Sequence, residues 1–109
     1  MELTFKSSQL QRLLESQKML RKKFGSKSER VIMRQMVLLD SAESIQDMLS
    51  GIGGWHELEA DRKGQCAGDA GGGKRIIVKP NPPVPKKQDG GTDWTKVKSV
   101  QVVEVEDYH

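Results

Sequence analysis

Glycines at positions 51, 53 and 54 divide this chain of 109 residues into two parts with different residue periodicity. Before the glycines, apolar residues recur every three or four positions, as on the buried face of a helix. After them, runs of β-branched residues predict strands. Because the helices precede the strands instead of alternating with them, the order predicts an α+β fold with helices packed on one face of a small antiparallel sheet.

The first part predicts a short strand followed by a helical hairpin. Apolar and polar residues alternate over 3–5, which predicts the opening strand. One amphipathic helix is expected from about 8 to Gly25, where the glycine ends it, and a second from about 26 to 41. A further helical turn is expected at 44–49.

The second part predicts four strands and one long loop. The strands are expected at 55–58, 64–69, 74–79 and 97–105, where β-branched residues are frequent. All four prolines fall between the last two strands, where they prevent a regular hydrogen-bonded ladder. Residues from about 80 to 95 are therefore expected to form an exposed loop.

Length and composition predict a single domain, 1–109, that works in the cytoplasm. The chain has no run of about 18 apolar residues for a membrane helix, and its start lacks the apolar core of a signal peptide. The single cysteine, Cys66, excludes an internal disulfide and has no cysteine partner for the usual zinc sites. We expect Cys66 to be a small packing residue, and no metal or other cofactor.

Positive charge is concentrated near the beginning of the chain. The net charge is +3, but residues 1–40 hold nine Lys and Arg against four acids, whereas residues 41–109 hold nine against eleven. The cluster around Lys22 and Lys23 is suited to RNA phosphates or to an acidic partner surface. A solvated helix face explains the same residues, and charge alone does not decide between these interpretations.

Residues 68–75 read G-x-x-x-x-G-K-R, one residue away from a nucleotide-binding loop. Arg75 stands where the hydroxyl that holds magnesium is required, and the residues after it predict a strand instead of the helix that such a loop needs. A glycine-rich hairpin turn between two strands explains the segment without a nucleotide.

Both histidines have ionisable neighbours. His56 precedes Glu57, and His109 follows Asp107 and Tyr108. Two histidines can divide the base and acid roles of RNA cleavage, because the 2′-hydroxyl of RNA is an internal nucleophile and no metal is required. Arg75 is a candidate for neutralising the phosphate, and Tyr108 for stacking on a base or helping to transfer a proton.

Three segments together resemble the HigB branch of the RelE/ParE toxins. They are His56-Glu57-Leu58 with Asp61-Arg62-Lys63-Gly64-Gln65, then Lys74-Arg75-Ile76-Ile77, then Glu106-Asp107-Tyr108-His109. The resemblance covers about half the chain, and its most specific parts are the Asp-Arg-Lys-Gly segment and the closing Asp-Tyr-His. It implies the RelE/ParE-like fold, ribosome-dependent cleavage of mRNA, and neutralisation by a HigA-like helix-turn-helix antitoxin in a hetero-oligomer.

The resemblance also implies a set of functional residues. It places the catalytic residues on His56, Arg75, Asp107, Tyr108 and His109. The basic residues expected to contact RNA are Arg62, Lys63, Lys74, Lys22 and Lys23.

This chain departs from the family pattern near His56. Glu59 stands where the family has a lysine, Ala60 replaces a glycine, and Cys66 replaces an aromatic residue. The change to Glu59 puts a negative charge where a positive one is expected near the scissile phosphate. Two alternatives therefore stay open: a catalytically weakened protein of the same fold that binds a HigA-like antitoxin, and a DNA gyrase inhibitor of the ParE kind.

Overall fold

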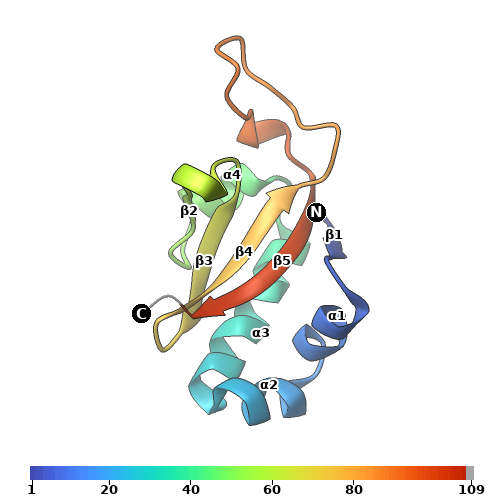
Figure 1. Ribbon diagram of the computed structural model, residues 1–109, viewed down its shortest axis with the longest axis vertical. Coiled ribbons are helices and arrows are strands. Elements are labelled where there is room, and N and C mark those ends of the chain that lie inside the picture. The colour runs from blue at the N-terminus through green and yellow to red at the C-terminus, as the bar shows by residue number, and fades with distance from the viewer. Residues whose placement is uncertain (108–109) are drawn as a thin grey trace.

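The computed structural model describes residues 1–107, which form four helices, two 3-10 turns and five strands (Figure 1). The helices are α1 (Ser8–Leu14), α2 (Gln17–Phe24), α3 (Ser26–Ser41) and α4 (Ile45–Ser50). The strands are β1 (Glu2–Phe5), β2 (His56–Glu57), β3 (Cys66–Gly71), β4 (Lys74–Pro80) and β5 (Ser99–Asp107). The 3-10 turns are η1 (Ala60–Arg62) and η2 (Trp94–Lys96).

All five strands belong to one sheet, in the order β1-β5-β4-β3-β2. The three pairs from β2 to β5 are antiparallel, as expected. The expectation of a purely antiparallel sheet was wrong for β1, which lies parallel to β5 with Leu3 opposite Val100. The helices separate β1 from the other strands in sequence, and the last strand, β5, pairs with it.

The first predicted helix is divided into α1 and α2. The Oγ atom of Ser16 accepts a hydrogen bond from the backbone N–H of Met19 at 3.1 Å, and it therefore caps a new helix. Ser7 caps α1 in the same way, through the N–H of Leu10. A serine hydroxyl competes with the helical hydrogen-bond ladder, so a serine inside an apolar helical pattern can mark a boundary that apolar spacing does not reveal.

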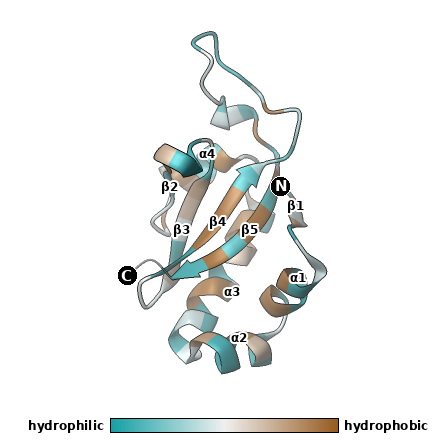
Figure 2. Cartoon of the chain, viewed as in Figure 1, coloured by the Kyte–Doolittle hydropathy of each residue, from teal (hydrophilic) through white to brown (hydrophobic). Residues whose placement is uncertain are grey.

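The helices cover one face of the sheet and enclose the main core. Ile76, Val78, Val100 and Val102 point from β4 and β5 toward buried residues of the helices, such as Ile32 and Leu39. Figure 2 shows these apolar segments in the middle of β4 and β5, with the end of β5 hydrophilic. The opposite face of the sheet is covered only in part, by a small cluster around Ile77.

One buried polar side chain, Gln35 of α3, connects the helices to the sheet. Its Nε2 donates to the backbone carbonyls of Gly53 and Asp69, both at 2.8 Å. Its Oε1 accepts a hydrogen bond from the indole N–H of Trp55 at 2.9 Å. These contacts fix the chain that enters β2 against both α3 and β3.

The glycine-rich segment forms the hairpin turn that the sequence predicts, whereas the proline-rich segment leads into η2, where Trp94 is buried. Gly71, Gly72 and Gly73 have positive φ angles in the turn that joins β3 to β4, and a strand instead of a helix follows. The chain between β4 and η2 extends away from the sheet (Figure 1).

Cys66 is fully buried, and desolvation raises the pKa of its thiol to about 12. In the part of the chain that the structure describes, no helix is long and apolar enough to span a membrane.

Substitution of Gly68 by alanine is expected to destabilise the protein. A Cβ atom at Gly68 would lie 2.2 Å from Cε2 of Trp55, whose indole is held by Gln35. We expect Gly68→Ala to lower the free energy of unfolding by about 1–3 kcal/mol or more, measured by urea denaturation. Gly91→Ala is the matched control, since the nearest atoms there belong to flexible side chains. Equal stability of the two variants would contradict this packing.

Candidate functional site

The face of the sheet opposite the helices carries the polar residues that the sequence singles out. Alternation along β4 points Ile76 and Val78 into the main core, whereas Ile77 packs with Leu58 and Ala67 on the opposite face. Arg75 is two residues from Ile77 and therefore lies on the same face. We call this side of the sheet, which carries Arg75, Ile77 and Ala67, the open face.

Two arginines and two glutamates form an ionic cluster on the open face. Glu106 of β5 bridges the arginines: its Oε1 accepts from Nε of Arg75 at 2.9 Å, and its Oε2 accepts from Nη2 of Arg62 at 2.7 Å. The same Nη2 of Arg62 donates to Oε2 of Glu104 at 2.6 Å. Arg62 also donates to the side chain of Gln65 at 3.0 Å. The cluster thus joins residues that are more than forty positions apart in sequence.

A β-bulge places Glu104 in this cluster. Ile77 of β4 lies opposite Glu104, whereas the next residue, Val78, lies opposite Val102, so Val103 is the extra residue of β5. Val103 packs against the small apolar cluster on the open face. Without the bulge, strict alternation would place Val103 and Glu104 on opposite faces. The bulge therefore lets a second carboxylate reach Arg62.

The cluster shifts the pKa values of two of its members. Hydrogen bonding from Arg75, followed by that from Arg62, lowers the pKa of Glu106 despite partial desolvation. The hydrogen bond to Glu104, and then that to Glu106, raises the pKa of Arg62. Glu106 is therefore ionised at neutral pH, and the arginines are oriented by fixed carboxylates.

The pKa of Glu106 predicts a dependence of stability on pH. Because the folded pKa lies below its ordinary value of 4.5, the contribution of Glu106 is complete above pH 4.5 and is lost as the pH falls through the folded pKa. We expect Glu106→Gln to cost about 1–3 kcal/mol at pH 7 and to reduce the loss of stability below pH 4.5. Denaturation curves at several pH values measure both effects.

The exposed Glu43, in the connection between α3 and α4, provides the control through Glu43→Gln. Some dependence on pH remains in every variant, since hydrogen bonding from Thr95 also lowers the pKa of Asp93. A pH profile of Glu106→Gln identical to that of Glu43→Gln would show that the cluster contributes nothing to acid stability.

Arg62 is presented by the turn η1, which begins in an unusual conformation. Ala60 has a φ of +57°, in the left-handed region that glycine adopts without cost. Glycine, which has no Cβ, is therefore the residue best suited to this position. The backbone N–H of Arg62 then bonds to the carbonyl of Glu59 at 3.2 Å and closes the turn.

Glycine at position 60 is expected to stabilise the protein. A left-handed conformation costs a residue with a Cβ about 1–2 kcal/mol, which the greater chain entropy of unfolded glycine offsets in part. Ala60→Gly should raise the free energy of unfolding by about 0.5–1 kcal/mol, measured by chemical denaturation. Ala60→Val should lower it, because a β-branched residue is poorly suited to this conformation. A loss of stability in Ala60→Gly would argue against the turn.

His56 lies on β2, at the edge of the open face. It pairs with Ala67, which in turn pairs with Ile77, so its side chain belongs to the same face as Arg75. From strand spacing, about 12 Å separates the Cα atoms of His56 and Arg75. Leu58 packs on Ala67 and Ile77 of the same face. The imidazole is exposed, and its Nδ1 lies 3.2 Å from the carbonyl of Gly54. That bond requires the proton on Nδ1 and leaves Nε2 facing away from it.

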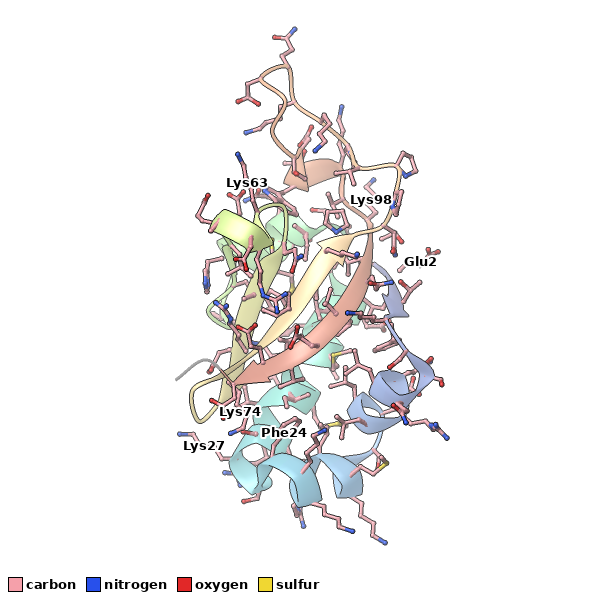
Figure 3. The ribbon with its side chains drawn as sticks, in the orientation of Figure 1. Glu2, Phe24, Lys27, Lys63, Lys74 and Lys98 are labelled. Atoms are coloured by element: carbon pink, nitrogen blue, oxygen red, sulfur yellow. The ribbon has the colours of Figure 1, made fainter. Side chains whose placement is uncertain are left out.

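The predicted basic residues lie in two places. Arg62 and the exposed Lys63 belong to the connection between β2 and β3 (Figure 3). Lys74 lies on the helix side of β4, with its Nζ 5.9 Å from the ring of Phe24, and Figure 3 shows these two side chains together. Lys22 and Lys23 are exposed on α2, at the same end of the molecule as Lys74.

Asp107 ends β5 opposite Lys74, so its side chain lies on the helix side and not with Arg75 and His56, which corrects the prediction that it shares their site. Tyr108 and His109 lie outside the described residues. The structure thus brings together Arg75, Arg62 and Glu106, and it places His56 on the same face. Among residues 1–107, no group of three or more His, Cys, Asp or Glu side chains is arranged to hold a metal ion.

Sequence reasoning did not identify Glu104 and gave Glu106 no role of its own. The acidic alternation of Glu104 and Glu106 within an otherwise β-branched strand was the available signal. Charged residues two apart on a strand share a face and require partners there. The bulge at Val103 cannot be predicted from the alternation of residue types along the strand.

Comparison with known proteins gives a result only at the level of structure. No protein-family model matches the chain, and no curated protein matches it. A YoeB/ParE toxin from Agrobacterium tumefaciens is similar over 100% of both chains, with a TM-score of 0.59 and 12% identity. The chain has the fold of the YoeB/ParE toxins.

Two further solved structures agree with this assignment of the fold. A YoeB-YefM complex from Staphylococcus aureus gives a TM-score of 0.56 at 14% identity. A heterotetrameric YoeB-YefM toxin-antitoxin complex from the same organism gives 0.56 at 16%. Each match covers 100% of this chain and 97% of the other. The α+β, RelE/ParE-like fold expected from the sequence is thereby confirmed.

Proposed function

We propose that this chain is a HigB-type toxin of a type II toxin-antitoxin system, which cleaves mRNA on the ribosome in the cytoplasm. The observation that carries the proposal is the convergence of Arg62 and Arg75 on Glu106, at the end of β5 that leads into Asp107. Guanidinium groups on a sheet face, oriented by a fixed carboxylate, form a suitable site for the phosphate of RNA. The fold shared with known toxins supports the same conclusion.

In this proposal the substrate supplies the nucleophile. His109 removes the proton of the 2′-hydroxyl, the 2′-oxygen attacks phosphorus, and the bond from phosphorus to the 5′-oxygen breaks. His56 donates a proton to the leaving 5′-oxygen through Nε2. Arg75, with Arg62, neutralises the charge that develops on the phosphate. The reaction requires no metal, because the nucleophile belongs to the RNA.

We also propose that a HigA-like helix-turn-helix antitoxin binds and neutralises the protein in a hetero-oligomer. The two Staphylococcus aureus structures are complexes of YoeB with YefM, one of them a heterotetrameric toxin-antitoxin complex. The exposed basic residues Lys22 and Lys23 of α2 offer an acidic partner a surface on the helix side of the sheet.

Replacement of Arg75 should remove cleavage. With ribosomes and a translated mRNA, the wild-type protein should leave a 2′,3′-cyclic phosphate at the cut. An mRNA with a 2′-deoxy nucleotide at that position should stay intact. Arg75→Ala should reduce the rate by about 10²–10³, and Arg75→Lys should restore it only in part, because lysine lacks the bidentate fork. Gel analysis of the products and their ends measures these effects.

The exposed Arg34 of α3 provides the matched control, since Arg34→Ala changes the net charge equally. Cleavage retained in Arg75→Ala would remove Arg75 from the mechanism. The weakened-protein alternative is favoured by Glu59 and by the carboxylate partners that both arginines already have. Cleavage by Glu59→Lys, with none by the wild type, would select that alternative. Inhibition of supercoiling without RNA cleavage would select the gyrase inhibitor.

A further inference from the structure

The two glutamates of the ionic cluster hold Arg62 in different ways. Glu106 uses both carboxylate oxygens, one for each arginine, and its side chain is 22% exposed. Glu104 contacts Arg62 through Oε2 and is 44% exposed. Glu106 is therefore built into the sheet face as a bridge, whereas Glu104 approaches Arg62 from the solvent side of the cluster.

The backbone directs Glu104 to this position at the expense of regular strand pairing. The bulge at Val103 leaves one residue of β5 without a partner on β4, and its effect is to turn Glu104 toward the open face. Bulges occur frequently beside active sites, where they redirect a side chain. The backbone of β5 therefore positions Glu104 for its contact with Arg62.

We infer that Glu104 occupies the place on Arg62 that a phosphate group of RNA takes, and that substrate binding displaces it. The inference rests on the proposed function for the identity of the ligand, but the exchange itself concerns any phosphate. A carboxylate and a phosphate present the same kind of acceptor oxygens to a guanidinium group. One can therefore replace the other on Nη2 of Arg62 without moving the arginine.

Exposure decides which of the two carboxylates leaves. An ion pair open to water contributes little, so an incoming phosphate can replace Glu104 at small cost. Glu106 remains between the arginines and keeps them oriented. Once displaced, Glu104 still repels phosphate from close range. Ligands with a single phosphate contact are thereby disfavoured, and an RNA that makes several contacts is selected.

Titration with inorganic phosphate at constant ionic strength tests the exchange. Guanidinium and amide chemical shifts are followed by NMR in the wild type, Glu104→Gln and Glu43→Gln. Glu104→Gln should bind phosphate about two- to fivefold more tightly than the wild type, because an exposed ion pair no longer competes. Glu43→Gln makes the same change in net charge and should bind like the wild type. Equal affinity in the two variants would overturn the inference.

A double variant assigns the effect to Arg62. In an Arg62→Gln background, the change Glu104→Gln should no longer tighten phosphate binding, and a gain that persisted would also overturn the inference. A single-stranded 2′-O-methyl RNA, which cannot be cleaved, provides the second probe. This RNA should also bind Glu104→Gln more tightly than the wild type, because no carboxylate has to leave Arg62.

Phosphate binding and mRNA cleavage, measured on the same variants, separate this inference from the proposed function. Tighter phosphate binding in Glu104→Gln, together with no RNA cleavage by any variant, supports the exchange and removes the nuclease proposal. Cleavage of mRNA by the wild type with no effect of Glu104→Gln on phosphate binding does the reverse.

Discussion

The arrangement of the open face depends on a polar side chain buried behind it. Gln35 is 1% exposed, and it makes three hydrogen bonds, to the carbonyls of Gly53 and Asp69 and to the indole of Trp55. One of them reaches the carbonyl of Asp69, the residue that pairs with Arg75 across β3 and β4. Loss of a buried partner costs more than its hydrogen bond contributes, so the register beside Arg75 is strongly specified. Among the described residues, no buried side-chain polar atom lacks a partner.

Much of the fold could be predicted because local patterns agree with the final structure. The β-branched run Ile76-Ile77-Val78 placed β4 correctly, and the glycines after residue 70 indicated a hairpin turn where a nucleotide-binding loop would need a helix. These features depend on residues that are close together in sequence, so local sequence patterns can predict them.

The remaining features arise from contacts between distant residues. The parallel pairing of β1 with β5 joins segments 97 residues apart, and no local pattern distinguishes it from an antiparallel pair. The division of the first predicted helix into α1 and α2 depends on whether the Ser16 hydroxyl caps α2 or faces solvent. At the site, Arg62 meets Glu104 and Glu106 because a left-handed Ala60 and a bulge at Val103 coincide. The left-handed residue and the bulge each have a physical reason, but neither can be predicted before the pairing of the strands is known.

The position of β5 between β1 and β4 has a consequence for the order in which the protein is made. A chain emerges from the ribosome with its beginning first, and β5 is the last strand to appear. Until then β1 has no neighbour in the sheet, and β4 lacks one of its two. Glu104 and Glu106 belong to that same strand, so the arginines meet their carboxylates only when synthesis of the described chain is nearly finished. A nascent chain of this fold therefore carries its helices and two arginines long before it carries an assembled site.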